Sequence, residues 1–143
     1  MIDIRAMLQE ETLRVRELYA MCYPGRATQP PGWYFVNPTF VALDGSRVVG
    51  FTSCNVTLLP GYGQVMYGKD MCVHPEYRGR GIAKTLHEIR LALGREVGAR
   101  IFMGVAFKDN VAMGEILKKA GAHECLTVED GTLYTGLIPE LDY

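Results

Sequence analysis

The chain has 143 residues, 48% of them apolar and 22% charged, and its formal net charge is −1. This length and composition are those of one ordinary globular domain, which we predict to span residues 1–143. A net charge so close to zero argues against nucleic acid or an anionic membrane as a partner, so any anion site has to be local.

The four cysteines indicate neither a zinc site nor a redox motif. Cys22, Cys54, Cys72 and Cys125 are widely separated and form no Cys-x-x-Cys pair. Such a pattern is typical of buried free thiols in a reducing compartment. Nowhere do about 18 apolar residues stand together, and the N-terminus has no long apolar run. We therefore expect a cytoplasmic protein without a membrane span or a bound metal.

The first predicted elements are a strand and a helix. Apolar and charged residues alternate at residues 2–6, which favours a short strand. Residues 10–21 have apolar positions near helical spacing, and two glutamates suit the start of a helix there. The apolar positions of this helix recur at Leu13, Leu18 and Met21, with Val15 and Tyr19 beside them.

Residues 23–38 break every periodic pattern and are predicted to form a long loop. Proline and glycine recur through the segment, and the aromatics Trp33, Tyr34 and Phe35 stand side by side in it. A long loop of this kind in a compact domain is more often functional than idle. The aromatics fit a cap on the core equally well, so both interpretations stay open.

A hairpin and a further strand follow. Two apolar runs, residues 39–43 and 48–56, flank the turn sequence Asp44-Gly45-Ser46-Arg47. After a second turn at residues 60–63, residues 64–73 form the strand that leads into the most informative part of the chain.

That part is a glycine-rich junction between the strand and a helix. The first turn of a helix has N–H groups without partners, and the helix dipole adds positive charge there. Gly79 and Gly81 remove the Cβ atoms that would keep a pyrophosphate away from these groups. Arg78, Arg80 and Lys84 surround the same place with full positive charges. The sequence therefore predicts a diphosphate-binding loop.

Two other kinds of phosphate loop are excluded by single positions. A Walker A loop needs a glycine directly before its Lys-Thr, where Ala83 stands. A dinucleotide fingerprint needs a third glycine three residues after Gly81, where Lys84 stands, and it belongs in the first βαβ unit of a chain.

The remaining elements complete an α+β order. A helix follows Ala83 and ends near residues 94–98, and the nearly continuous apolar run at residues 100–106 predicts a buried strand parallel to residues 64–73. Asn110 precedes another helix, which carries Leu117 on its apolar side and ends at Gly121. A last hairpin joins residues 125–128 to residues 132–138.

The loop resembles that of the GNAT superfamily of acyl-CoA-dependent N-acyltransferases. The family pattern Arg/Gln-x-x-Gly-x-Gly/Ala is met by Arg78, Gly81 and Ala83, after Val-His-Pro-Glu-Tyr. Residues 39–138 supply the family's order of elements as well. The resemblance implies a mixed, mostly antiparallel central sheet with splayed central strands, flanked by helices. It also implies acetyl-CoA as cosubstrate, and dimers are common in the family.

The same resemblance implies a set of residues that hold the coenzyme. The pantetheine arm would bond to the main chain of Met71, Cys72 and Val73, and Asn110 would help to position it. Residues 23–38 would form much of the acceptor side of the cleft. The pyrophosphate would be held by the loop and the start of its helix, namely by Arg78, Gly79, Arg80, Gly81, Ile82, Ala83 and Lys84.

Candidates for proton transfer are fewer. An alkyl ammonium, with a pKa near ~10.4, must lose a proton before it attacks, and the CoA thiolate is best protonated as it leaves. The tyrosine that many family members use as the acid is replaced here by Leu117. Asp70 is our first candidate for the base. Tyr67 lies on the opposite face of the same strand, because the spacing is odd, and Tyr67 and Tyr134 are the candidate acids.

The leading hypothesis is an N-acetyltransferase that moves an acetyl group from acetyl-CoA to a primary amine of a small molecule or peptide by direct attack. The alternative is a non-catalytic acyl-CoA-binding or regulatory module, which the substitution at Leu117 motivates. Modification of nucleic-acid bases is disfavoured by the charge balance.

Overall fold

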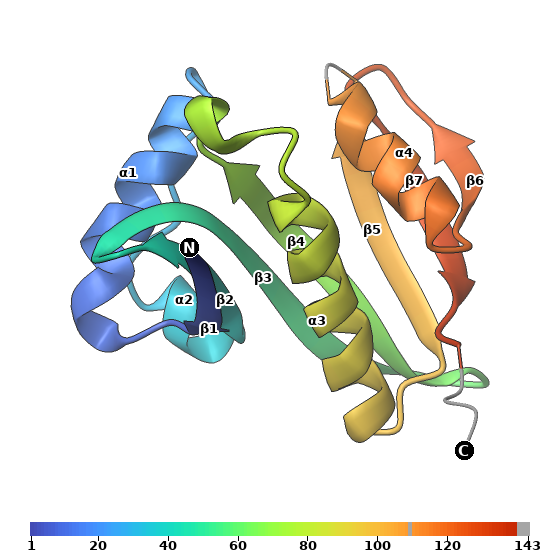
Figure 1. The fold of residues 1–143 in the computed structure, drawn as a ribbon. Helices are drawn as coiled ribbons and strands as arrows, with labels where there is room; N and C mark the ends of the chain where they lie inside the picture. Colours follow the sequence, from blue (N-terminus) through green and yellow to red (C-terminus); the bar gives the residue numbers. More distant parts are fainter. Residues whose placement is uncertain (109, 140–143) are drawn as a thin grey trace. The chain divides into compact units, whose positions relative to one another are not determined.

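The computed structural model describes residues 1–108 and 110–139, and its elements follow the predicted order (Figure 1). The strands are β1 (Ile2–Ala6), β2 (Thr39–Asp44), β3 (Arg47–Leu59), β4 (Gly63–Val73), β5 (Ile101–Phe107), β6 (His123–Thr127) and β7 (Gly131–Leu137). The helices are α1 (Thr12–Cys22), α2 (Trp33–Val36), α3 (Ile82–Glu96) and α4 (Val111–Lys119), with 3-10 turns η1 (Gln9–Glu11) and η2 (Pro75–Tyr77).

The described strands form a seven-stranded sheet in the order β1-β2-β3-β4-β5-β7-β6. β4 and β5 pair in parallel, from Val65 opposite Ile101 to Gly68 opposite Gly104, as the apolar run of β5 predicted. The pairs β1–β2, β2–β3, β5–β7 and β6–β7 are antiparallel. The predicted α+β class with a mixed, mostly antiparallel sheet is confirmed.

Contacts within the chain define two compact units, which divide β3, β4 and α3 between them. The first unit contains Met1–Cys54 and Asp70–Leu86. The second contains Asn55–Lys69 and the described residues from His87 onward. The glycine-rich loop and Asp70 therefore belong to the first unit, and Asn110 and Tyr134 belong to the second.

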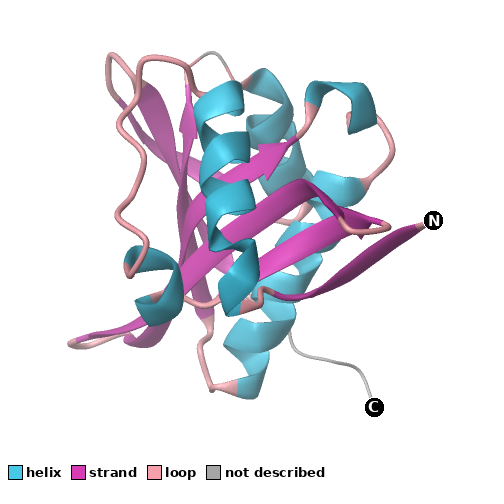
Figure 2. Cartoon of the chain, turned by 90° about the vertical axis from the view of Figure 1, so that its left-hand side faces the viewer, coloured by secondary structure: helices cyan, strands magenta, loops and turns pink. Residues whose placement is uncertain are grey.

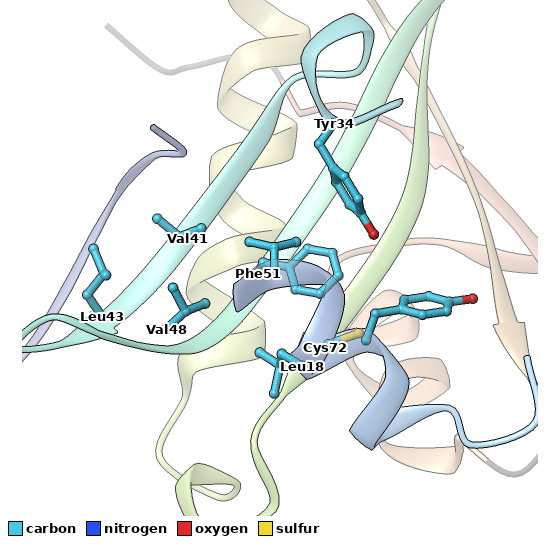
Figure 3. Close-up of a cluster of buried hydrophobic side chains, with 9 residues drawn as sticks. Leu18, Tyr34, Val41, Leu43, Val48, Phe51 and Cys72 are labelled. Carbon is cyan, nitrogen blue, oxygen red and sulfur yellow. The ribbon is translucent and has the colours of Figure 1, made fainter. Parts of the chain in front are cut away.

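The first unit has its apolar core between α1 and the strands. Leu18 of α1 lies beside Cys72 of β4, in the same cluster as Phe51 of β3 (Figure 3). β1, which begins at the N label in Figure 2, is an edge strand of the sheet and pairs with β2. The buried members of this core are Val15, Leu18, Tyr19, Tyr34, Val41, Leu43, Val48, Phe51 and Cys72.

The face that α1 buries differs in part from the predicted one. Leu18 is buried as expected, but Leu13 and Met21 are 63% and 53% exposed. The stripe on the core is formed instead by Val15, Leu18 and Tyr19, which follow the spacing of three and four residues that places side chains on one helix face. Leu13 and Met21 are apolar residues on the other faces of the helix.

Part of the segment predicted as a loop is helical. Trp33–Val36 forms the single turn α2, which starts where the backbone N–H of Trp33 donates to the carbonyl of Pro30. Tyr34 of this turn is buried, and its ring packs edge-on against Phe51 with the centroids 6.0 Å apart. The aromatic Tyr34 thus caps the core, whereas Phe35 is exposed.

Two tyrosines of the first unit differ in how their hydroxyls are bonded, and this difference gives a stability prediction. The buried Tyr34 hydroxyl has no hydrogen-bond partner among the described residues, whereas the Tyr23 hydroxyl donates to the carbonyl of Met71 at 2.8 Å. An unsatisfied buried hydroxyl is costly, and a made hydrogen bond contributes about 1 kcal/mol. We expect Tyr34→Phe to leave the free energy of unfolding in urea unchanged or raised, and Tyr23→Phe to lower it by about 1 kcal/mol. Equal losses would contradict this assignment.

The second unit packs α4 against β5 and β7 (Figure 1). Met113 and Leu117 of α4 are buried, as the predicted apolar side of this helix required. Residue 114 is a glycine for a steric reason, because a Cβ there would stand 2.8 Å from the hydroxyl oxygen of Tyr134 on β7. Glycine lets the helix approach this tyrosine closely.

A buried histidine and arginine also belong to the second unit. His87 and Arg90 of α3 are 2% and 3% exposed, and the Arg90 Nη2 donates to His87 Nδ1 at 2.9 Å. The ring of Phe102 on β5 lies edge-on to His87, and the guanidinium carbon of Arg90 is 5.1 Å from the centre of that ring. Burial, and then the charge of Arg90, lower the pKa of His87 to about 3. His87 is therefore neutral at physiological pH.

This pKa predicts a pH-dependent loss of stability. His87 has a lower pKa in the folded chain than its ordinary 6.5, so the unfolded chain binds the proton more tightly and stability falls as the pH drops below 6.5. An asparagine at position 87 can accept the hydrogen bond from Arg90 through its side-chain oxygen, and asparagine does not titrate. We expect wild type to lose about 2 kcal/mol more than His87→Asn between pH 7 and pH 5 in urea unfolding. The exposed His123→Asn is the control, and a loss as large in His87→Asn as in wild type would contradict the assignment.

Candidate active site

The glycine-rich loop has the backbone that an anion site requires. Gly79 and Gly81 adopt φ angles of 79° and 81°, in the left-handed region that favours glycine. A Cβ built on either residue would meet nothing within 4 Å, so the side of the loop that lacks Cβ atoms is open. The first intrahelical bond of α3 runs from the Thr85 N–H to the Gly81 carbonyl, which leaves the earlier N–H groups available at the helix start.

Tyr77 fixes the loop to the turn between β2 and β3. Its hydroxyl donates to the carboxylate of Asp44, and this bond raises the pKa of Tyr77. The guanidinium carbons of Arg80 and Arg47 lie 4.7 Å and 5.7 Å from the centre of its ring. The ring therefore holds the charge of Arg80 next to the loop.

His74 caps the turn that precedes the loop. Its Nδ1 accepts the backbone N–H of Glu76 at 3.1 Å, and its Nε2 is 3.1 Å from Nη2 of Arg47. The side chain is 9% exposed and lies edge-on to Tyr77. His74 thus has a structural role in shaping the loop.

Arg78 points back toward the end of β4. Its Nε donates to the carbonyl of Val73 at 3.0 Å, and its Nη2 lies 3.9 Å from the Sγ of Cys22. The exposed Arg80 and Lys84 are the other two cations at the loop. Of the three basic residues expected to meet an anion, Arg78 is therefore the one that also ties the loop to the strand.

The last residues of β4 are bonded to side chains from elsewhere in the first unit. The carbonyl of Met71 accepts the hydroxyl of Tyr23 at 2.8 Å, and that of Asp70 accepts the hydroxyl of Thr52 at 2.7 Å. A carbonyl oxygen has two lone pairs, so the Met71 carbonyl can accept a second bond from another extended molecule, whereas the Val73 carbonyl already accepts bonds from Arg78 Nε and Cys22 Sγ.

Asp70 acts electrostatically on two tyrosines, Tyr19 of α1 and Tyr34 of α2. The pKa of Tyr19 and that of Tyr34 are raised, chiefly by burial and then by the charge of the Asp70 carboxylate. The Asp70 side chain is half-buried. A carboxylate in such surroundings can accept a proton from a bound donor.

The other predicted site residues lie in the second unit. Tyr67 is half-buried on β4, opposite Met103 of β5, and Lys69 Nζ is 5.1 Å from the centre of its ring. Tyr134 is buried on β7, and its hydroxyl donates weakly to Glu124 at 3.5 Å.

Asn110 has a clear local role. Its Oδ1 accepts the backbone N–H of Met113 at 3.2 Å, which makes Asn110 the N-cap of α4. The predicted contact of Asn110 with the coenzyme arm stays a prediction.

The comparisons with known proteins decide the family. A model of the acetyltransferase (GNAT) family matches residues 12–122 of the chain, which is more than half of its length. The chain belongs to the GNAT acetyltransferase family. The predicted family and the prediction of an acyltransferase are thereby confirmed. No curated protein matches the sequence.

Solved GNAT-like structures share the fold at low sequence identity. NAA60 of Arabidopsis thaliana in complex with acetyl-CoA has a TM-score of 0.83 and 16% identity, over 96% of this chain and 99% of that one. The yncA protein of Salmonella typhimurium with acetyl-CoA has a TM-score of 0.79 and 17% identity, over 99% and 96%. Naa50 of A. thaliana with the bisubstrate analogue CoA-Ac-MVNAL has a TM-score of 0.78 and 16% identity, over 94% and 97%.

Two properties of the described residues of this GNAT domain bear on its chemistry and environment. No group of three or more His, Cys, Asp or Glu side chains in residues 1–108 and 110–139 is placed to hold a metal ion. Over the same ranges, none of the helices combines the length and the apolar character that crossing a membrane demands.

Leu117 was predicted to stand where many family members carry an acid tyrosine, and that correspondence stays a prediction. The residue is 1% exposed and lies on the buried side of α4. The side chain is therefore part of the core, and it carries no proton to donate.

Two residues at the end of α1 were missed by sequence reasoning. Tyr23 bonds to Met71, and Cys22 lies against Val73 and Arg78, each about fifty residues away in the chain. No periodicity connects positions so far apart. The one sequence signal for a tertiary contact here was that Cys22 directly precedes, and Tyr23 begins, the aromatic-rich segment 23–38.

Proposed function

We propose that this GNAT domain is an acetyl-CoA-dependent N-acetyltransferase that acetylates a primary amine of a small molecule or peptide. The observation that carries the proposal is the loop at Gly79 and Gly81, where two left-handed glycines leave open space over the start of α3. A side chain at either position would fill the space that a diphosphate needs. The family match, and the acetyl-CoA in the NAA60 and yncA structures, support the same ligand.

The residues present fit the coenzyme in two places. Backbone N–H groups from Gly79 to Lys84, with Arg80 and Lys84, would hold the pyrophosphate. The main chain of Met71, Cys72 and Val73 would bond to the amide groups of the pantetheine arm. Asn110 would help to position that arm.

The chemistry then requires two proton transfers. Acetyl-CoA supplies an acyl thioester that an amine can attack. Asp70 would accept the proton that the acceptor ammonium must lose, directly or through a water molecule. A backbone N–H of Met71 or Cys72 would polarise the acyl carbonyl. Tyr67 or Tyr134 would give a proton to the departing thiol, in place of the tyrosine that Leu117 replaces.

A second candidate function is a non-catalytic acyl-CoA-binding or regulatory module. It is favoured by the buried Leu117, a residue without an ionisable group where the resemblance implies the family acid. An alkyl thiolate is a fair leaving group, so the loss of this acid is compatible with slow turnover. The two functions differ in one measurable property, the release of thiol in the presence of an amine.

The loop makes a binding prediction. Gly81→Asp adds both a side chain in a left-handed backbone and a negative charge, so we expect the Kd for CoA in calorimetry to rise at least about tenfold, or 1.4 kcal/mol. Gly81→Ala adds the side chain alone and should weaken binding less. Gly61→Ala, at a φ of 85° in the turn between β3 and β4, is the matched control and should bind like wild type. Wild-type affinity in a folded Gly81→Asp variant would overturn the proposal.

Asp70 makes a catalytic prediction. Asp70→Asn keeps the shape of the side chain and removes the base, so we expect kcat to fall at least about 100-fold while the Kd for acetyl-CoA stays unchanged. The measurement is thiol release from acetyl-CoA over a panel of primary amines, with the exposed Asp3→Asn as control. Wild-type turnover in Asp70→Asn would place the base elsewhere. Tight acetyl-CoA binding by wild type without thiol release for any amine would favour the binding module.

A further inference from the structure

Two of the four free cysteines meet where α1 ends against β4. Cys22, the last residue of α1, places its Sγ 3.6 Å from the carbonyl oxygen of Val73. Cys72, the preceding residue of the strand, is 2% exposed in the apolar core, and Cys22 packs against that core. Each of the two thiols shifts the pKa of the other, so their side chains are close neighbours. Neighbouring cysteine side chains are the arrangement that a disulfide requires.

The surroundings make the two thiols chemically different. The neighbouring Cys72 thiol, and then the Arg78 guanidinium, lower the pKa of Cys22 to about 7. Burial, the neighbouring Cys22 and the charge of Asp70 raise the pKa of Cys72. Cys22 is half-buried, so a small molecule reaches it more readily than it reaches Cys72. A thiolate beside a protonated thiol is the combination found in reactive thiol pairs.

The other two cysteines lack this arrangement. Cys54 is buried on β3 and its thiol donates to the carbonyl of Pro38 at 3.7 Å. Cys125 is exposed on β6, with its Sγ 2.7 Å from the hydroxyl of Thr135. The chain therefore offers one buried and one exposed cysteine as internal controls.

We propose that Cys22 and Cys72 form an oxidisable thiol pair, which hydrogen peroxide converts to an intramolecular disulfide. The Cys22 thiolate attacks one peroxide oxygen, the O–O bond breaks, and with one proton the products are a sulfenic acid and water. The Cys72 thiol then attacks the Cys22 sulfur, forming the S–S bond and releasing a second water. Two electrons pass from the two thiols to the peroxide, and a dithiol reductant reverses the change.

The disulfide would alter the junction between the strand and the loop. Cys22 would no longer present a thiolate to Arg78, whose Nη2 lies 3.9 Å from its sulfur in the reduced chain. The end of α1 would be linked covalently to β4 at the residue before Val73. The proposal concerns these thiols alone, so it stands or falls independently of the acetyltransferase assignment.

The test oxidises the full-length chain with hydrogen peroxide, then alkylates the remaining thiols and measures the intact mass and its peptides. We expect alkylation to fall from four thiols to two, with the loss of two hydrogens, a Cys22–Cys72 linked peptide, and full recovery after dithiothreitol. Cys125→Ser should form the same disulfide. Cys22→Ser should keep Cys72 alkylatable after unfolding. Oxidation of Cys125 alone, or of Cys22 to a sulfinic acid with Cys72 still free, would overturn the proposal.

A second variant separates the two roles within the pair. In Cys72→Ala the resolving thiol is absent, so the sulfenic acid at Cys22 should accumulate and be trapped by dimedone, whereas wild type should show little trapping. Removing a buried sulfur lowers stability, so circular dichroism is used to confirm that the variant is folded. If Cys72→Ala does not fold, the comparison of wild type with Cys22→Ser still decides the outcome. Equal dimedone labelling of wild type and a folded Cys72→Ala variant would also overturn the proposal.

Discussion

The first turn of α3 carries backbone N–H groups that no helix can satisfy from within, and much of the first unit serves to present them. Gly79 and Gly81 turn the chain into the helix without side chains on the open side. Tyr77 and His74 fix the approach to this turn from the β2–β3 side, and Arg78 fixes it to the end of β4. An anion bound there would complete a set of hydrogen bonds that the fold leaves open.

The end of β4 combines main-chain bonding with unusual side-chain electrostatics. Tyr23 bonds to the carbonyl of Met71, and the Asp70 carboxylate acts on buried phenols and on the Cys72 thiol. These groups are gathered by α1 and α2, elements that lie far from β4 in the sequence. The first unit therefore contains both the loop and the candidate base.

Local patterns predicted the parts of this structure that depend on neighbouring residues. The glycine-rich loop, the parallel pairing of β4 with β5 and the buried side of α4 all follow from short-range sequence signals. The buried face of α1 was predicted only in part, because apolar residues occur on more than one side of that helix. The contacts of Tyr23 and Cys22 with β4 depend on tertiary packing across about fifty residues, which spacing in a single sequence does not encode.

The hydrogen bond from Tyr77 to Asp44 makes the position of the glycine-rich loop depend on the β2–β3 hairpin. Asp44 is the last residue of β2, 33 positions away from Tyr77 in the chain. Conservative changes at Asp44 or Arg47 would alter how rigidly the loop is presented while leaving every group that faces a ligand in place. An engineer who wished to adjust how long a coenzyme resides on this domain would therefore begin at that hairpin.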